Sequence, residues 1–265
     1  MSNWPVFITA PEVPVKQLNK ALLLLADYEF DCSPQWTLIL TKTLPPPPLS
    51  SPISETTSTT ATTNTESTAN AATTPSIPPL PLPSPTLTCT TNDFAQKSPH
   101  DIYTYLADPQ TRIQFRDRDL TASNWLVIDQ RGLDSESCLL AEYISPADWE
   151  EEKEKEKEAE EEQENDEEED KKEKGNAIAY PYRMCRIPWT RAWAMFCNLD
   201  IANMDFEEWV DEERGPVEAD SGAWAWGGPF GGQDKGYDEE DDDEDEEVVR
   251  KREMAVRRGV EGGWV

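Results

Sequence analysis

Residues 124–144 read NWLVIDQRGLDSESCLLAEYI, and this stretch holds two short apolar runs on either side of a polar segment. The runs at 124–129 and 138–144 have the length of strands, and their continuous apolar character is typical of strands buried in a sheet. A turn is expected around Arg131 and Gly132, between the two runs. The stretch therefore predicts two consecutive buried strands.

The segment that begins the chain adds a strand, a helix and a second strand. Residues 6–9 are rich in β-forming side chains, and residues 36–41 form a second such run. Between them, apolar residues recur at helical spacing, which predicts a helix over 16–28. If the two strands lie parallel in one sheet, the helix is the crossover of a right-handed βαβ unit.

A helix over 99–107 is predicted from its first residues. Ser98 is a good N-cap, Pro99 suits the first helical turn, and Asp101 completes a capping box with Ser98. Further along, residues 182–187 form a strand pattern that ends at a proline. Two more helices follow, one over 189–199 with a wide apolar face and one over 205–213, where Asp205 and Glu208 form a second capping box.

These elements predict one small α/β (or α+β) domain with a three- to five-stranded sheet and about four helices. The domain is built from residues 1–44, 93–147 and 177–215. Each part buries too little surface to be stable alone, whereas together they have the size of an ordinary domain.

Long segments of biased composition interrupt and follow these parts. Residues 45–92 form a Pro/Ser/Thr linker, expected to be disordered because it has too few apolar side chains to offset its ordering entropy. Its prolines favour a spacer over an SH3 or WW ligand, since no basic residue flanks them. Residues 148–176 form an acidic Glu/Lys insertion that can adopt a charged, solvated helix. Residues 216–265 are expected to be a disordered Gly/Trp tail that turns acidic and then basic.

Charge is concentrated in two tracts. The net charge of the chain is −30; residues 148–174 hold 17 acidic and 6 basic side chains, and all ten residues of 238–247 are acidic. Because a chain with this much negative charge repels a phosphate backbone, we expect no nucleic-acid partner.

The compartment is expected to be intracellular, either cytoplasmic or nuclear. The chain begins with no basic region or long apolar run, so no signal peptide is expected, and no apolar run is long enough to span a bilayer. The five cysteines are odd in number and widely spaced, with no C-x-x-C pair. We therefore expect free thiols, no membrane partner and no metal or other cofactor.

The segment from Asn198 to Trp209 reads NLDIANMDFEEW. It resembles the closing signature of a small domain of unknown function found in fungi and bacteria. In that signature an Asn-Leu segment precedes an Asn-Met-Asp-Phe-Glu-Glu-aromatic helix start. Residues 7–9 and 127–129 are similar to features of the same family. The resemblance implies a single domain and supplies no activity, cofactor or site residue.

Polar candidates for a functional site are few. His100 is the only histidine, and no partner for nucleophilic catalysis accompanies it, so no catalytic residue is assigned. Asp129 ends a buried strand, where α/β proteins often carry functional groups, but a cap or turn role is the alternative. Asp200 and Asn203 lie close to Asp205, yet they lack the order of a calcium loop. Asp129, Asp200 and Asn203 remain weak candidates for a polar site.

Three tail tryptophans, Trp224, Trp226 and Trp264, are candidate interaction residues. Aromatic side chains in an acidic tail are typical of a short binding motif. The alternative, which the sequence leaves open, is that the tail folds back on its own domain.

The sequence favours a non-enzymatic, intracellular protein-interaction domain over two alternatives. One alternative is an acidic, chaperone-like binder of basic proteins. The other is an enzyme of unrecognised type that uses Asp129. Salt dependence separates the first two, because a purely charge-driven binder loses its partners steeply as ionic strength rises.

Overall fold

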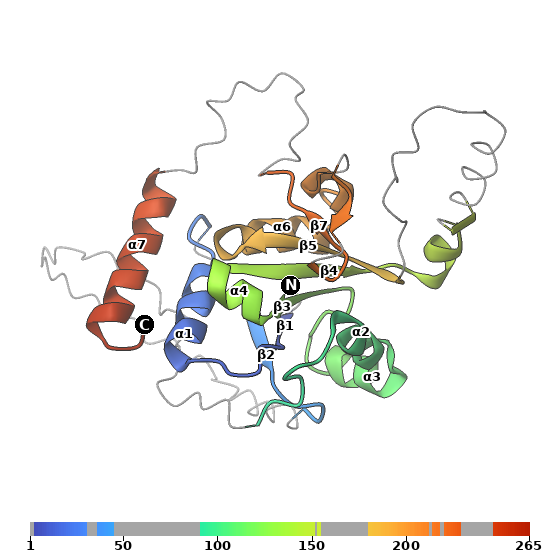
Figure 1. Ribbon diagram of the computed structural model, residues 1–265, viewed down its shortest axis with the longest axis horizontal. Helices are drawn as coiled ribbons and strands as arrows, with labels where there is room; N and C mark the ends of the chain where they lie inside the picture. The colour runs from blue at the N-terminus through green and yellow to red at the C-terminus, as the bar shows by residue number, and fades with distance from the viewer. Residues whose placement is uncertain are drawn as a thin grey trace, which may run out of the picture.

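The computed structural model describes residues 3–30, 36–44, 91–151, 153–154, 180–211, 214–217, 220–228 and 246–265. Within these residues the chain forms one mixed sheet with the strand order β2-β1-β3-β4-β5-β7-β6, flanked by helices (Figure 1). The strands are β1 Trp4–Ile8, β2 Trp36–Ile39, β3 Asn124–Ile128, β4 Ser137–Tyr143, β5 Tyr182–Pro188, β6 Pro216–Val217 and β7 Ala223–Ala225. The helices are α1 Val15–Leu24, α2 Pro99–Ala107, α3 Pro109–Arg116, α4 Gln130–Ser135, α6 Ala192–Asp200 and α7 Glu246–Glu261, with 3-10 turns η1 Trp189–Arg191 and η2 Phe206–Trp209.

The predicted α/β class is confirmed, and the strand number is corrected. Strand β1 is parallel to β2 and β3, as a crossover unit requires, whereas β4 is antiparallel to both β3 and β5. Strand β7 extends the sheet parallel to β5, and β6 pairs antiparallel with β7. Within the described residues the sheet therefore has seven strands instead of three to five. The two additional strands are only two and three residues long, too short to show an alternating pattern in the sequence.

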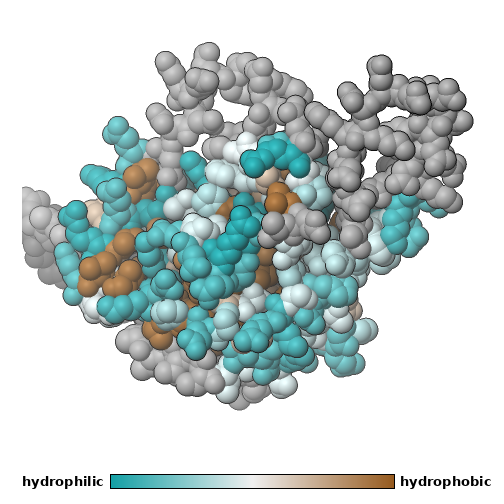
Figure 2. Space-filling view, in the orientation of Figure 1, coloured by the Kyte–Doolittle hydropathy of each residue, from teal (hydrophilic) through white to brown (hydrophobic). Residues whose placement is uncertain are grey.

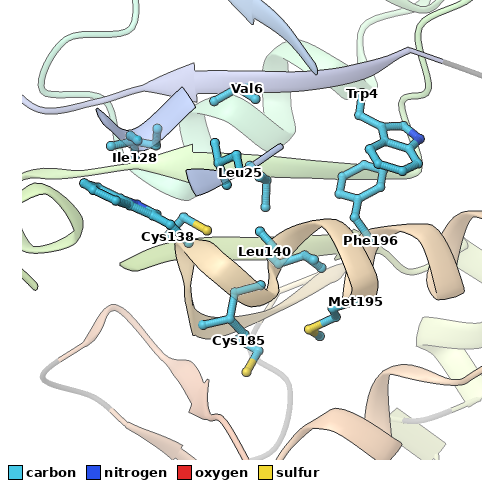
Figure 3. Packing of buried hydrophobic residues seen from close by; sticks show 14 of the residues in the cluster. Trp4, Val6, Leu25, Ile128, Cys138, Leu140, Cys185, Met195 and Phe196 are labelled. Carbon is cyan, nitrogen blue, oxygen red and sulfur yellow. The ribbon is translucent and has the colours of Figure 1, made fainter. Parts of the chain in front are cut away.

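Alternate side chains of the strands lie in two hydrophobic cores, one on each face of the sheet. On one face Val6, Leu126 and Leu140 pack with α1 and α6, as Figure 3 shows for part of this core. On the other face Phe7 and Trp125 pack against α2 and α3. Burial on both faces explains why the central strands are continuously apolar, since each fully buried large side chain contributes roughly 1.5–3 kcal/mol.

Both predicted capping boxes are present. The Ser98 hydroxyl accepts the backbone N–H of Asp101, whose carboxylate accepts the backbone N–H of Ser98 at 2.9 Å, and α2 spans the predicted residues. Asp205 and Glu208 form the second box. The helix that follows is only the turn η2, shorter than the predicted 205–213, because Val210 turns to extended backbone and bridges to Trp226.

The turn predicted around Arg131 and Gly132 is instead the short helix α4, capped by the Asp129 carboxylate. Gly132 is needed there for close packing: a Cβ at this position would lie 2.4 Å from the Ser137 carbonyl oxygen. Glycine marked a turn in the sequence, but its role is to let α4 lie directly against the start of β4.

The expectation of a disordered tail is corrected for its described residues. Strands β6 and β7 join the sheet, and α7 packs beside α1 at the edge of the molecule (Figure 1). Val248 and Ala255 of α7 are buried with Tyr28, and Gly259 lies against Leu23. The apolar positions of α7 are few and mostly small, and they lie among many charged residues, so the composition of this segment concealed an amphipathic helix. Most of the two predicted insertions, at 45–92 and 148–176, lies outside the described residues.

The outer face of α7 differs from the face that packs on α1. Figure 2 shows hydrophobic side chains over α7 and α1, surrounded by hydrophilic ones. Met254 and Val260 are among the exposed apolar residues of this helix, and Arg250, Arg257 and Arg258 are exposed beside them. The apolar residues on this outer face are therefore separated by charged side chains.

Candidate functional site

Asp129, the residue of the enzymatic alternative, is fully engaged in structural contacts. Its Oδ1 accepts the Gly132 backbone N–H at 2.6 Å and thereby caps α4. The Arg186 guanidinium pairs with both carboxylate oxygens, at 3.1 Å from Nη1 to Oδ1 and 2.6 Å from Nη2 to Oδ2. Asp129 is therefore the cap residue that the sequence had offered as the alternative to a functional group.

Arg186 is the centre of a buried ion-pair network on β5. Besides Asp129 it binds Asp220, which lies in the connection between β6 and β7, and Asp220 also pairs with Arg131 at 3.2 Å. Burial opposes the charge of Arg186, but hydrogen bonds to Asp220 and Asp129 outweigh burial and raise its pKa. Because each charge has an opposite partner, the network fastens the β6–β7 hairpin and α4 to β5.

Asp200 and Asn203 have separate structural partners. The Asp200 carboxylate accepts the Trp4 indole N–H at 3.2 Å, and the Asn203 amide donates to the Asn198 side chain at 2.8 Å. Among the described residues, no group of three or more His, Cys, Asp or Glu side chains could hold a metal ion. The three weak polar candidates are thus distributed over different contacts and do not converge on one site.

The tail tryptophans lie against the domain. Trp224 and Trp226 are half-buried and pack against the core that contains α1 and α6, and Trp224 pairs with Cys185 in the sheet. The Trp264 carbonyl accepts the Asn19 side-chain amide at 2.8 Å. Of the two possibilities that the sequence left open, the structure shows a tail that folds back at these three residues.

The buried thiols of Cys138 and Cys185 face the same core. Burial raises the pKa of both thiols. A thiol held in its neutral form is a poor nucleophile and a poor metal ligand, so both cysteines act as small hydrophobic core residues.

A cluster of stacked aromatic rings lies where β4 ends and β5 begins. It consists of residues from α2 (His100 and Tyr103), the end of β4 (Tyr143), and the start of β5 with the residue two before it (Tyr182 and Tyr180), here called the tyrosine patch. Figure 1 shows α2 on the same side of the molecule as these strand ends. Tyr180 and Tyr182 stack at 5.3 Å between centroids, as do Tyr103 and Tyr182.

The patch is open to solvent at its rim. His100 is exposed and lies 5.3 Å from the Tyr180 ring, which is itself 44 % exposed, whereas Tyr182 is buried beneath them. Tyr103 links this end to Tyr143, at 5.9 Å between centroids. The rings thus form a continuous surface from the buried sheet outward.

Two phenols of the patch, those of Tyr103 and Tyr182, are held neutral. Burial raises the pKa of Tyr103 and of Tyr182, and neighbouring phenols raise both further. A neutral phenol is a weak base, so the patch offers ring faces and hydroxyl groups for binding more readily than groups for proton transfer.

Sequence reasoning missed the tyrosine patch because its residues come from three separate segments. A partial signal was present in each segment: His100 and Tyr103 are three apart on a helix, and Tyr180 and Tyr182 are two apart near a strand. Only the pairing of β4 with β5, which places Tyr143 opposite Tyr182, brings the segments together.

Comparison with known proteins adds no relative. No family model matches the chain, and no curated protein or solved structure gives a significant match. The resemblance of residues 198–209 to a small domain family therefore stays a prediction. Within the described residues, no helix is both long and apolar enough to cross a membrane.

Proposed function

We propose that this protein is a non-enzymatic interaction domain that binds a protein partner at the tyrosine patch. The observation that carries the proposal is the exposed rim of a stacked aromatic surface, formed by His100 and Tyr180 over buried Tyr182. Tyrosine is enriched at protein interfaces because it combines a large apolar ring, few rotatable bonds and a hydroxyl group.

The polar groups support binding over catalysis. Asp129 uses both carboxylate oxygens on Gly132 and Arg186, so its charge stabilises the fold. The cysteine thiols of the core are buried, and His100 has ring contacts with three tyrosines. A protein-interaction role requires no change in these contacts, whereas an enzyme that uses Asp129 would first have to break the ion pair between Asp129 and Arg186.

Affinity capture with matched variants tests the proposal. The full chain is immobilised as wild type, as Tyr103→Ala/Tyr180→Ala, and as Phe30→Ala. Phe30 is an aromatic residue outside the patch, 62 % exposed, whose ring lies 5.5 Å from the Trp193 ring between centroids. We expect partner proteins to be retained by wild type and Phe30→Ala and lost by the double variant.

Circular dichroism and thermal unfolding check that the variants are folded. If Tyr103→Ala disturbs the packing of α2, the single variant Tyr180→Ala replaces the double variant, because Tyr180 is largely outside the core. An identical set of captured proteins for all three chains would show that the patch is not the binding site.

A further inference from the structure

We infer that the segment received by the tyrosine patch is cationic and rich in arginine. This inference rests on the proposed function and names the chemistry of the partner. Three observations carry it: the orientation of the rings, a guanidinium already stacked on the patch, and the acidic residues that flank the patch in the sequence.

Two ring pairs of the patch stack in nearly parallel planes. The interplanar angle is 14° between Tyr103 and Tyr143, and 16° between Tyr180 and Tyr182. The face of an aromatic ring carries the negative part of its quadrupole. An uncovered face of such a stack attracts cations, and a planar cation can lie flat on it.

The chain itself already places a guanidinium on this surface. Arg112 of α3 lies with its guanidinium carbon 4.6 Å from the centroid of the Tyr143 ring. Its Nε donates to the Leu106 carbonyl oxygen at 3.2 Å, which holds the side chain in position. Arg112 therefore occupies one end of the patch, and the rings of His100 and Tyr180 form the exposed end.

Acidic residues flank the segments of the patch in the sequence. In the sequence, the tract at 148–174, with 17 acidic and 6 basic side chains, begins five positions after Tyr143 and ends six positions before Tyr180. Asp101 lies on α2 next to His100, and hydrogen bonds from Ser98 hold the pKa of its carboxyl below the usual range. The resulting negative potential concentrates cations at these rings.

Arginine fits this surface better than lysine. The guanidinium is planar and weakly hydrated and stacks on aromatic faces, whereas the ammonium group of lysine is a compact, strongly hydrated point charge. An acidic tract alone would attract both cations equally. A preference for arginine over lysine would therefore come from the rings and not from the acidic tract.

Three peptides of equal length separate these contributions. They are an Arg-Gly repeat, the matching Lys-Gly repeat, and the matching citrulline-Gly repeat, which keeps the shape of arginine without its charge. Fluorescence anisotropy with the full chain measures each affinity at low and at physiological ionic strength. We expect the arginine peptide to bind at least tenfold more tightly than the citrulline peptide and several-fold more tightly than the lysine peptide.

Variants assign the preference to the patch. Tyr180→Ala should weaken the arginine peptide by about two- to fivefold, the range of an exposed cation–π contact, and should reduce the preference over lysine. Phe30→Ala should leave both the affinity for the arginine peptide and the preference over lysine unchanged. A chain with Glu160, Glu161, Glu162 and Glu164 replaced by Gln should bind all cationic peptides more weakly but keep the preference for arginine.

The inference is overturned if citrulline and arginine peptides bind equally, or if Tyr180→Ala behaves as Phe30→Ala does. Failure here is distinguishable from failure of the proposed function. If the captured proteins bind through the patch but contain no cationic segment, the proposed function stands and only the inferred chemistry of the partner is wrong.

Discussion

Arg186 on β5 and Asp220, in the connection between β6 and β7, are joined by two hydrogen bonds, from Nε to Oδ2 at 2.6 Å and from Nη2 to Oδ1 at 2.7 Å. Both side chains are nearly buried, at 10 % and 9 % exposed. Strand β6 is two residues long and β7 is three, so backbone pairing alone holds this hairpin weakly. The ion pair therefore provides additional stabilisation that attaches the hairpin to β5.

Asp220→Asn should therefore lower the free energy of unfolding by about 3 kcal/mol, because it leaves a buried guanidinium with only Asp129 as its carboxylate partner. Urea unfolding followed by tryptophan fluorescence measures the change. The control is Asp211→Asn, whose pair with Arg214 is 3.9 Å long and has the arginine side chain 69 % exposed; this substitution should cost less than about 1 kcal/mol. Equal effects of the two substitutions would contradict a special role for the buried pair.

Gly132→Ala should destabilise the domain by about 1–3 kcal/mol, the usual cost of overpacking. The added methyl group would lie 2.4 Å from the Ser137 carbonyl oxygen and 2.9 Å from the Asp129 carboxylate, so α4 must move away from β4. Thermal unfolding tests this change beside Asp134→Ala, an exposed position of the same helix. If Gly132→Ala raises the midpoint, as alanine does in an open helix, the close approach of α4 to β4 is wrong.

Alkaline pH should loosen the contact between α7 and the rest of the domain. Burial raises the pKa of Tyr28 to about 12, although the charge of Arg252 opposes the shift. The folded state therefore favours the neutral phenol, whose hydroxyl donates to the Leu23 carbonyl oxygen at 2.9 Å. An unfolded tyrosine has a pKa of about 10, so this stabilisation is complete below about pH 10 and is lost as the pH rises to about 12.

Unfolding free energies of wild type and Tyr28→Phe between pH 9 and 12, compared at each pH, check this dependence. Wild type should lose about 2 kcal/mol more than Tyr28→Phe over that interval, since a shift of one pKa unit corresponds to about 1.4 kcal/mol. Parallel pH curves for the two proteins would show that Tyr28 titrates without any link to folding.

Replacing residues 46–89 with a short Gly/Ser linker should leave the domain folded. The chain on either side of this segment is already close together: Asp93 accepts the Lys42 backbone N–H at 3.0 Å, and the Asp93 N–H donates to Leu40. Shortening the loop from over 40 residues to about six should stabilise the domain by roughly 1–2 kcal/mol, at about 0.6 kcal/mol per halving. Thermal unfolding that loses cooperativity, or a midpoint lowered by several degrees, would mean that residues 46–89 contribute to the core.

Local signals determined how much of the fold could be predicted. Helix α2 was predicted to its exact bounds because Ser98, Pro99 and Asp101 act within one turn. Strands β3 and β4 were predicted because burial on both faces leaves a continuous apolar run. In contrast, β6, β7 and α7 depend on partners far away in the sequence, such as Arg186 for Asp220 and Leu23 for Gly259. No window of sequence contains both members of such a pair.

The candidate site was predictable only in part, for the same reason. Asp129 was placed correctly at the end of a strand, but its pairing with Arg186, 57 positions away, decides that it has a structural role. The tail tryptophans stand out as aromatic side chains in an acidic segment, whereas each tyrosine of the patch, taken alone, matches an ordinary core or surface position. Sheet register is what converts single tyrosines into a surface.

The packing of α7 on α1 also has a consequence for the time course of synthesis. Asn19 and Trp264, which share a hydrogen bond across this contact, are 245 positions apart. At the usual rates of translation, about 5–20 residues per second, roughly 10–50 s pass between the synthesis of α1 and that of its cover. During this interval Leu23 and Asn19, both buried in the finished domain, lack the neighbours that α7 provides. During synthesis the first helix thus exposes a surface that is buried in the finished domain. A ribosome-associated chaperone can bind this surface until the last twenty residues cover it.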